Sequence, residues 1–322
     1  MNSREAVIRA VKFQSPGRLA YDFPEPFGTD FMFAAMDPHP GALLSKGIDE
    51  WGAVWNNVGE SKIGQVVGFP LEDWSCFDSL KIPDIEDGKR WEKIKDIREK
   101  AGEKFLLCEG ISIFEQLKFL RRLENVCLDI YDSPEKLEML IDILVSMNLT
   151  AVSKYHMLGG DGYIIGDDWG MQKTLVVPPE SWRRLWKPAY ARIFDAVHKA
   201  GMLTFLHSCG YIADILDDLV DIGLDAIHMD QQENMGLELL GSRFRGKITF
   251  FATVDIQNTM CKGSPDDIRE YCLKMARELL CIEGGFIPRW YTDPEGAGHR
   301  REAIDTMCRE FLKISQEIYG AL

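Results

Sequence analysis

From residue 104 onward, short apolar runs alternate with amphipathic segments along the chain. The runs whose length and composition predict strands are 105–108, 162–166, 203–206, 226–229, 248–252 and 286–287. Between them, apolar residues recur at spacings of three and four, which is typical of helices with one buried face. Repeated βα units with right-handed connections imply a parallel sheet. About six such units in one chain favour a closed (β/α)8 barrel of the TIM type over an open sheet, so the expected fold class is α/β.

The expected helices carry recognisable start and stop signals. Ser133 and Ser264 are each followed by proline, as at many helix N-termini. A helix that begins near Pro179 is expected to be interrupted or kinked at Pro188. The last helix is expected over residues 302–319, where apolar residues again recur at spacings of three and four.

Residues 14–90 show no such regularity and are rich in aromatic residues, Gly and Pro. Long irregular stretches inside compact proteins are usually functional, so we expect this segment to pack over the barrel and help to roof a pocket. An ordinary irregular cap is the alternative. The expected organisation is a single domain over residues 1–322, with an N-terminal elaboration over 1–100 and the main βα repeats over 101–322.

The chain is acidic, with 37 Lys and Arg against 51 Asp and Glu and a formal net charge of −14. This is the wrong sign for coating a phosphate backbone, so nucleic acid is not an expected partner. The N-terminus lacks the apolar core of a secretory signal, and no apolar run approaches the ~20 residues of a membrane span. We expect a soluble cytoplasmic protein without a membrane partner, in which most of the eight cysteines are reduced.

Polar residues follow the apolar runs at the points where the strands are expected to end. In a TIM-type barrel the site lies at the carboxyl ends of the strands, so these residues are expected to converge. They are Glu109, Asp167, Asp168, His207, Cys209, His228, Asp230, Gln231, Asp255, Gln257, Arg289, Tyr291 and Asp293. Any one of them could be a solvated loop residue, but their recurrence at consecutive strand ends favours a shared pocket.

The tetrad over residues 207–210 closes one of these strands with a His-x-Cys pair. Two residues apart on a strand, His207 and Cys209 point to the same side of the chain. Alone, each would more often be a hydrogen-bonded histidine or a buried thiol. Together, imidazole and thiolate suit Zn2+, which prefers a tetrahedral shell of N and S donors and keeps one position open when it is catalytic. Two ligands do not complete a shell. The candidates for the rest are Glu109, Asp168, His228, Asp293 and a further cysteine.

Five segments of the chain carry a resemblance to a known family. They are residues 167–170 (Asp-Asp-Trp-Gly), 207–210 (His-Ser-Cys-Gly), 221–225 (Asp-Ile-Gly-Leu-Asp), Gln231 and residues 284–287 (Gly-Gly-Phe-Ile). In these segments the chain resembles the uroporphyrinogen decarboxylase superfamily, and specifically its branch of corrinoid-dependent methyltransferases. The resemblance implies a (β/α)8 barrel in which the His-x-Cys pair binds zinc. It also implies that zinc activates a methyl donor or acceptor atom against a methylcobamide carried by a separate corrinoid protein.

The chain departs from this family in two places. Thiol-methylating members have a further cysteine shortly after the Gly-Gly-Phe-Ile strand, whereas residues 288–293 here contain none. The third zinc ligand is therefore expected to be an oxygen donor or a residue elsewhere, with Asp293 and Glu109 the leading candidates. Decarboxylases carry an Arg-rich N-terminal motif that grips propionate groups, and residues 17–23 here lack it. A polyanionic porphyrinogen is thus a poor substrate candidate.

The resemblance and its departures lead to one expected function. It is a zinc-dependent methyltransferase that moves a methyl group from a small methylated substrate, plausibly an O-methyl ether, to the cobalamin of a corrinoid protein. An alkoxide or phenolate is a poor leaving group, so a Lewis acid is needed to stabilise the charge that develops. The candidate metal ligands are His207, Cys209, Asp293 and Glu109, the candidate catalytic residues are Asp168, Asp230 and Arg289, and the candidate substrate-binding residues are Trp169, Gln231, Trp290 and Tyr291.

Two rival functions stay open at this point. The first is a metal-independent decarboxylase of the same fold, in which Asp168 and Arg289 act on a carboxylated substrate. The second is a non-catalytic member that binds a corrinoid or another ligand. The sequence decides neither the identity of the methyl donor nor whether the chain forms a homodimer.

Overall fold

The computed structural model describes residues 1–38, 43–45, 47–57 and 64–320. Its strands are β1 (Phe31–Ala34), β2 (Leu43–Ser45), β3 (Ile48–Asp49), β4 (Val54–Asn57), β5 (Gly64–Gly68), β6 (Phe105–Glu109), β7 (Gly162–Gly166), β8 (Leu203–His207), β9 (Ala226–Met229), β10 (Thr249–Ala252) and β11 (Phe286–Pro288). Its α-helices are α1 (Ser3–Val11), α2 (Ile97–Ala101), α3 (Phe114–Arg121), α4 (Leu123–Asp132), α5 (Pro134–Met157), α6 (Pro179–Leu185), α7 (Lys187–Lys199), α8 (Ala213–Asp221), α9 (Leu237–Phe244), α10 (Thr259–Lys262), α11 (Pro265–Leu279) and α12 (Arg301–Tyr319). Short 3-10 helices are η1 (Trp74–Ser79), η2 (Gly88–Ile94) and η3 (Gln232–Asn234).

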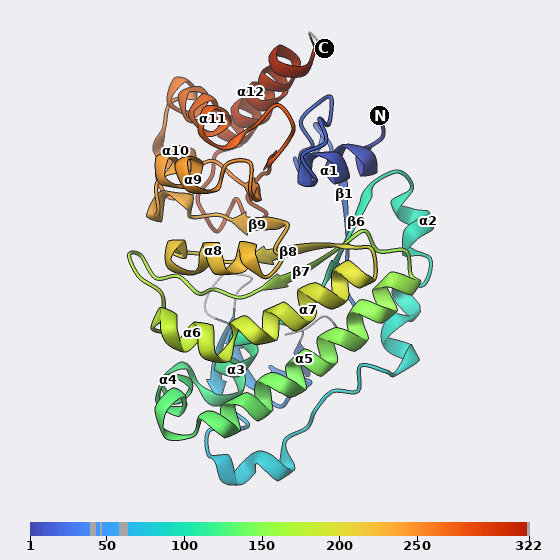
Figure 1. Ribbon diagram of the computed structural model, residues 1–322, viewed down its shortest axis with the longest axis vertical. Coiled ribbons are helices and arrows are strands. Elements are labelled where there is room, and N and C mark those ends of the chain that lie inside the picture. The colour runs from blue at the N-terminus through green and yellow to red at the C-terminus, as the bar shows by residue number, and fades with distance from the viewer. Residues whose placement is uncertain (39–42, 46, 58–63, 321–322) are drawn as a thin grey trace.

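Seven of the described strands form one sheet in the order β1-β6-β7-β8-β9-β10-β11. Every neighbouring pair in this order is parallel. The helices between successive strands lie outside the curved sheet, with the long helices α5 and α7 side by side (Figure 1). The TIM-type α/β fold that the alternating pattern predicts is therefore confirmed.

A short segment around Asp22 fills the place between the two ends of this sheet. The Asp22 backbone N–H donates to the Pro288 carbonyl over 3.0 Å, and the Trp290 N–H donates to the Asp22 carbonyl over 2.9 Å. On its other side Asp22 pairs in antiparallel fashion with Thr29, just before β1. Asp22 thus joins β11 to the start of β1 and closes the barrel.

The barrel interior is packed with aromatic rings toward the end where the strands begin. Phe31, Phe105, Phe205 and Phe251 contact one another there, with centroids 5.0 to 6.3 Å apart. Helix α1 covers this end, and its buried face belongs to the same apolar cluster. The opposite end, where the strands finish, carries the polar residues of the site.

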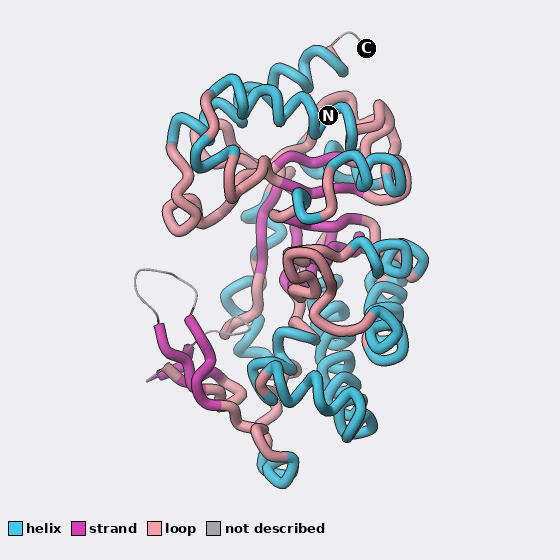
Figure 2. The backbone as a smooth tube through the Cα atoms, turned by 90° about the vertical axis from the view of Figure 1, so that its left-hand side faces the viewer, coloured by secondary structure: helices cyan, strands magenta, loops and turns pink. Residues whose placement is uncertain are grey.

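The segment before β6 holds more regular structure than its sequence suggests. Strand β1 belongs to the barrel, although the hydrophobic pattern does not identify it. Strands β2 to β5 form a separate antiparallel sheet that stands to one side of the barrel (Figure 2). Trp55 of β4 packs edge-on against Phe119 of α3, with ring centroids 4.8 Å apart. This contact joins the small sheet to the helices that follow β6.

The helix signals in the sequence are confirmed at three places. Ser264 caps α11 through a capping box with Asp267, and Ser133 occupies the N-cap position of α5. The helix expected from Pro179 is divided at Trp186 into α6 and α7. Within the described residues, no helix is long and apolar enough to cross a membrane.

Candidate functional site

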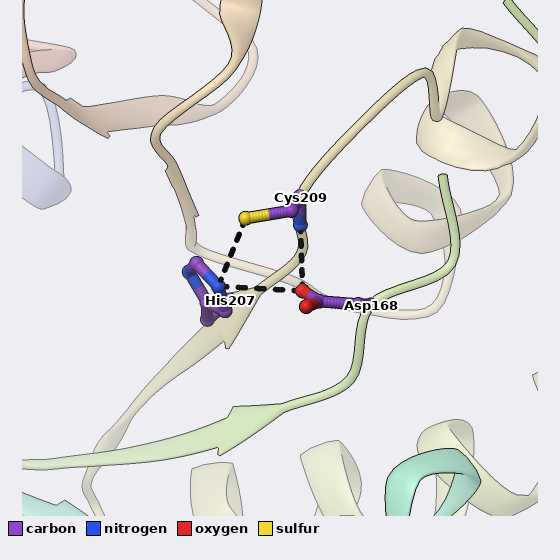
Figure 3. Close-up of side chains that lie close together, drawn as sticks. All are labelled: Asp168, His207 and Cys209. Atoms are coloured by element: carbon purple, nitrogen blue, oxygen red, sulfur yellow. Dashed lines mark hydrogen bonds and ion pairs between the residues drawn. The ribbon is translucent and has the colours of Figure 1, made fainter. Parts of the chain in front are cut away.

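The end of β8 and the loop after it bring His207 and Cys209 against a carboxylate from the neighbouring strand end. His207 Nε2 lies 3.5 Å from Cys209 Sγ and 3.4 Å from Asp168 Oδ1. The backbone N–H of Cys209 donates to the same carboxylate oxygen over 2.9 Å. Figure 3 shows the three side chains converging beyond the ends of β7 and β8. Asp168 is therefore a third donor within reach of the His-x-Cys pair.

Asp167 anchors the loop that carries Asp168. Its buried carboxylate accepts hydrogen bonds from the Ile113 N–H (3.0 Å), the Glu115 N–H (2.9 Å) and the Tyr190 hydroxyl (2.6 Å). Burial raises the pKa of Asp167 to about 7, and these hydrogen bonds oppose the rise. Successive side chains of an extended chain alternate, so Asp167 points inward and Asp168 toward the site.

Electrostatics within the group favour an ionised Asp168 and a protonated His207. Burial works to raise the pKa of Asp168, but the hydrogen bond and charge of His207 outweigh it and bring this pKa to about 2. Burial works to lower the pKa of His207, but Asp168 and Cys209 raise it well above its ordinary value. Burial raises the pKa of the Cys209 thiol, and His207 opposes the rise. The ionised Asp168 and the protonated His207 thus balance each other in charge beside a neutral Cys209 thiol, and a metal cation bound there would displace the protons from His207 and Cys209.

The separations within this group match those of a tetrahedral zinc shell. Ligand atoms bonded to zinc at about 2.1 Å (N, O) and about 2.3 Å (S) lie about 3.6 Å apart for N and S, and about 3.4 Å apart for N and O. The corresponding distances from His207 Nε2 are 3.5 Å and 3.4 Å. Asp168, His207 and Cys209 therefore fit zinc, with a fourth position left for another ligand.

A second set of candidate ligands shares His207 with the first. His207, His228 and Asp230 also lie close enough together to hold an ion. However, the Arg289 guanidinium donates to Asp230 Oδ1 over 2.6 Å and neutralises its charge. Of the two sets, the one with Cys209 contributes a sulfur donor, which zinc prefers. The set of Asp168, His207 and Cys209 is therefore the better metal site.

His207 opens into a cavity of about 630 Å³ at the mouth of the barrel. The sequence-predicted site residues that line it are Glu109, His207, His228, Asp230, Arg289, Tyr291 and Asp293. Glu109 and Asp293, the expected third ligands, thus lie on this wall. Within the described residues, neither belongs to a set of candidate ligands with His207 and Cys209, and Asp168 takes that place.

Trp169, expected in the pocket wall, lies in the core. Its indole is fully buried, stacks on Phe114 and donates through Nε1–H to the Tyr190 hydroxyl over 2.9 Å. The alternation that turns Asp168 toward the site turns Trp169 away from it. Trp169 therefore holds the loop in place from behind and does not line the cavity.

The other expected substrate contacts are divided between the loop and the cavity. Gln231 accepts a hydrogen bond from the Gly210 N–H over 3.0 Å and so supports the loop that carries Cys209. Trp290 packs against the main core. Tyr291 lines the cavity.

His228 has a more central position in the site than the sequence analysis indicates. The sequence names it only as one of several candidate ligands. In the structure it lines the cavity, and it pairs in strand register with His207. Because β8 and β9 are adjacent parallel strands, residues at matching positions lie side by side. The signal available in the sequence is a histidine at each of two consecutive strand ends.

Comparison with known proteins identifies a family and a shared fold. A family model described as uroporphyrinogen decarboxylase (URO-D) matches residues 59–287, which is most of the chain. This range includes Asp168, His207 and Cys209. A search of curated proteins gives no match.

Among solved structures, a methyltransferase from Methanosarcina mazei is similar over 98% of this chain and 99% of its own, with a TM-score of 0.71 and 15% sequence identity. At this identity, the likeness shows that the fold is shared. A D-psicose 3-epimerase matches 71% of this chain and 84% of its own at 14% identity, with a TM-score of only 0.45. An endo-β-1,4-xylanase from Gloeophyllum trabeum matches 70% of this chain and 80% of its own at 10% identity, with a TM-score of 0.42.

Proposed function

The chain belongs to the uroporphyrinogen decarboxylase family, and from that premise we propose that it is a zinc-dependent methyltransferase. It transfers a methyl group from a small O-methyl substrate to the cob(I)alamin of a separate corrinoid protein. The C–O bond breaks with its electron pair on the oxygen, and the methyl group passes to the corrinoid. The observation that carries this proposal is the set of Asp168, His207 and Cys209 at the barrel mouth. The shared fold with a methyltransferase supports it.

Asp168, His207 and Cys209 would hold the metal. Zinc, when bound, supplies a Lewis acid that stabilises negative charge developing on a leaving oxygen. The hydrogen bond from the Cys209 N–H fixes the carboxylate of Asp168 in its orientation toward His207. Ligands held in this way need little rearrangement to bind an ion, which favours tight binding.

The cavity beside His207 suits a small organic substrate. Its volume of about 630 Å³ lies within the range of roughly 300–1,000 Å³ that is usual for ligand pockets. Phe33, Ile164 and Tyr291 on its wall provide apolar surface that excludes water. The guanidinium of Arg289, held by Asp230, offers fixed N–H donors to orient substrate oxygens. The open barrel mouth leaves the approach for the corrinoid partner.

Metal analysis tests the first half of the proposal. Protein purified without chelators is expected to contain about one zinc per chain, because the three donors fit a single ion. The variants His207→Ala and Cys209→Ala should lose it, whereas Cys76→Ala, which removes an exposed thiol, should retain it. A wild-type protein that contains no zinc would contradict the proposed metal site.

Methyl transfer tests the second half. The zinc-loaded protein is incubated with a reduced corrinoid protein and a panel of methoxylated compounds, and the absorbance of cob(I)alamin is followed. We expect a loss of that absorbance with at least one O-methyl donor, and none with the zinc-free Cys209→Ala variant. Zinc-loaded protein without transfer from any donor would favour the non-catalytic binding role.

A decarboxylase is the second candidate, and two observations favour it. The matching family model is described by that activity, and Arg289 places a buried cation on the cavity wall, where a carboxylate could bind. Release of CO2 from a carboxylated substrate by metal-free protein would support the decarboxylase and contradict the methyltransferase.

A further inference from the structure

The hydrogen bond between the two cavity histidines determines which ring nitrogen carries each proton. His207 Nδ1 and His228 Nδ1 lie 3.1 Å apart, so one ring donates and the other accepts. Nε2 of His207 faces Cys209 and Asp168. A metal bound there uses the Nε2 lone pair, and the neutral ring then keeps its proton on Nδ1. In the metal-loaded protein, His207 is therefore the donor and His228 the acceptor.

The acceptor role leaves the proton of His228 on Nε2. This nitrogen is buried and has no hydrogen-bond partner within the described residues. Asp230 Oδ1 lies 3.8 Å from it, beyond hydrogen-bond distance. A buried donor is usually satisfied in a folded protein, so an unsatisfied one on a cavity wall indicates a ligand.

We propose that His228 positions the metal ligand His207 and donates a hydrogen bond from Nε2 to an oxygen atom of the substrate. This inference rests on the proposed metal site and deepens it. The bond between the Nδ1 atoms aims the lone pair of His207 Nε2 at the metal position. The same bond leaves the Nε2–H of His228, a residue of the cavity wall, available for donation. A substrate with an oxygen acceptor beside the transferred methyl group is favoured, because a thioether sulfur is a weak acceptor.

Two other roles would fit the position of His228 and can be distinguished from this one. The ring of His228 packs on Phe251 with centroids 5.1 Å apart, and a packing role requires only an aromatic ring. A direct ligand role, in the set with His207 and Asp230, requires a metal-binding nitrogen. The positioning role requires an acceptor atom at the place of Nδ1.

Two variants of His228 separate the three roles through zinc affinity, measured by competition with a chromophoric chelator. His228→Phe keeps the ring and removes the acceptor, whereas His228→Asn removes the ring and keeps an amide oxygen near the place of Nδ1. Loss of the outer partner of a ligand histidine usually weakens metal binding by about 10–100-fold, so we expect this for H228F and a change below about threefold for H228N.

Each other outcome of that measurement overturns the positioning role. Unchanged affinity in H228F would indicate packing, and an equally large loss in both variants would indicate direct ligation. Both outcomes leave the proposed metal site standing. A wild-type protein without zinc would overturn the metal site and this inference together.

Nitrogen NMR of the zinc-loaded protein tests the donor role. The chain has only six histidines, and the H228N variant assigns the signals of His228. We expect a protonated Nε2 and a bare Nδ1 in His228, and the reverse protonation in His207 with Nε2 on the metal. Phenol, used as the oxygen probe, should shift the Nε2–H signal of His228 and leave that of the exposed His156 unchanged. A proton on Nδ1 of His228, or a signal that phenol does not move, would overturn the donor role.

Discussion

Gly170 and Gly210 lie backbone against backbone, and a Cβ on either one would overlap the other's loop. The Gly170 N–H donates to the Cys209 carbonyl over 3.1 Å in this contact. The two glycines thus let the loop after β7 approach the loop after β8. Asp168 precedes one glycine and Cys209 the other, so this approach sets the distance between two of the proposed ligands.

We predict that Gly210→Ala weakens zinc binding, because its Cβ forces the loops of Asp168 and Cys209 apart. Gly201→Ala is the matched control. Both glycines have a φ of +75°, but a Cβ on Gly201 meets no atom within 4 Å. Left-handed backbone costs a non-glycine residue about 1–2 kcal/mol, so both variants should lose that much stability. G210A should lose more, because its Cβ also overlaps the backbone of Gly170. Only G210A should also lose zinc affinity, by more than about tenfold. Equal zinc affinities in the two variants would show that the close approach does not matter for the metal.

We predict that Asp168→Asn lowers zinc affinity more than Asp293→Asn does. Asparagine at 168 can still accept the hydrogen bond from the Cys209 N–H, so the loop is kept while the anionic ligand is lost. The expected loss is more than about tenfold for D168N and less than about threefold for D293N. Chelator competition measures both. The opposite order would restore Asp293 as the third ligand.

We predict that Tyr190→Phe destabilises the fold. The Tyr190 hydroxyl donates to Asp167 and accepts from Trp169 Nε1–H, and both partners are buried. The unsatisfied Trp169 N–H costs about 1–3 kcal/mol and the lost hydrogen bond to Asp167 adds about 1 kcal/mol, so the free energy of unfolding should fall by about 2–4 kcal/mol in urea denaturation. Tyr131→Phe, on an exposed ring, is the control and should change it by less than about 0.5 kcal/mol. A Y190F variant as stable as the control would mean that water replaces the hydroxyl.

We predict that the ion pair of His198 with Asp225 stabilises the protein at acidic pH only. The two side chains meet at 2.8 Å, and the hydrogen bond to Asp225 raises the pKa of His198. A histidine with a raised folded-state pKa stabilises fully below its unfolded pKa of about 6.5, and the contribution is lost as pH rises through the folded pKa. Because His198 is 40% exposed, solvent screening limits the effect to below about 1 kcal/mol.

His198→Gln removes the charge and tests this prediction. The wild type should exceed the variant in stability at about pH 5, and the difference should shrink by about pH 9. Exposed His156→Gln serves as the control. A difference that grows with pH would have the wrong sign for this pair.

The sequence pattern locates β6 to β11 but not β1. Each of the former is flanked by an amphipathic helix with its own start or stop signal, and this repetition identifies them. Strand β1 has four residues and no adjoining helix, and its partner β6 begins 74 positions later, in the pairing of Phe31 with Phe105. Only the tertiary pairing makes this segment a strand.

The candidate site could likewise be predicted only in part from the sequence. His207 and Cys209 are readable because they stand two residues apart at the end of a predicted strand, where the side chains of extended residues alternate in direction. The proposal of Asp168 in place of Asp293 as third ligand could not be made from the sequence, because it depends on how closely two loops approach at Gly170 and Gly210. Whether Trp169 faces the cavity or the core likewise depends on the packing of α6 and α7 behind it.

The barrel closes through the Asp22 segment, so it can close only after the residues that pair with Asp22 have been synthesised. These partners, the Pro288 carbonyl and the Trp290 N–H, emerge from the ribosome long after Asp22 itself. Until then β10 has no neighbour on one side, and an unpaired strand edge is a template for pairing with other chains. The nascent protein is therefore most prone to aggregate between the synthesis of β10 and that of β11, and slow codons in this interval should lower the yield of folded protein.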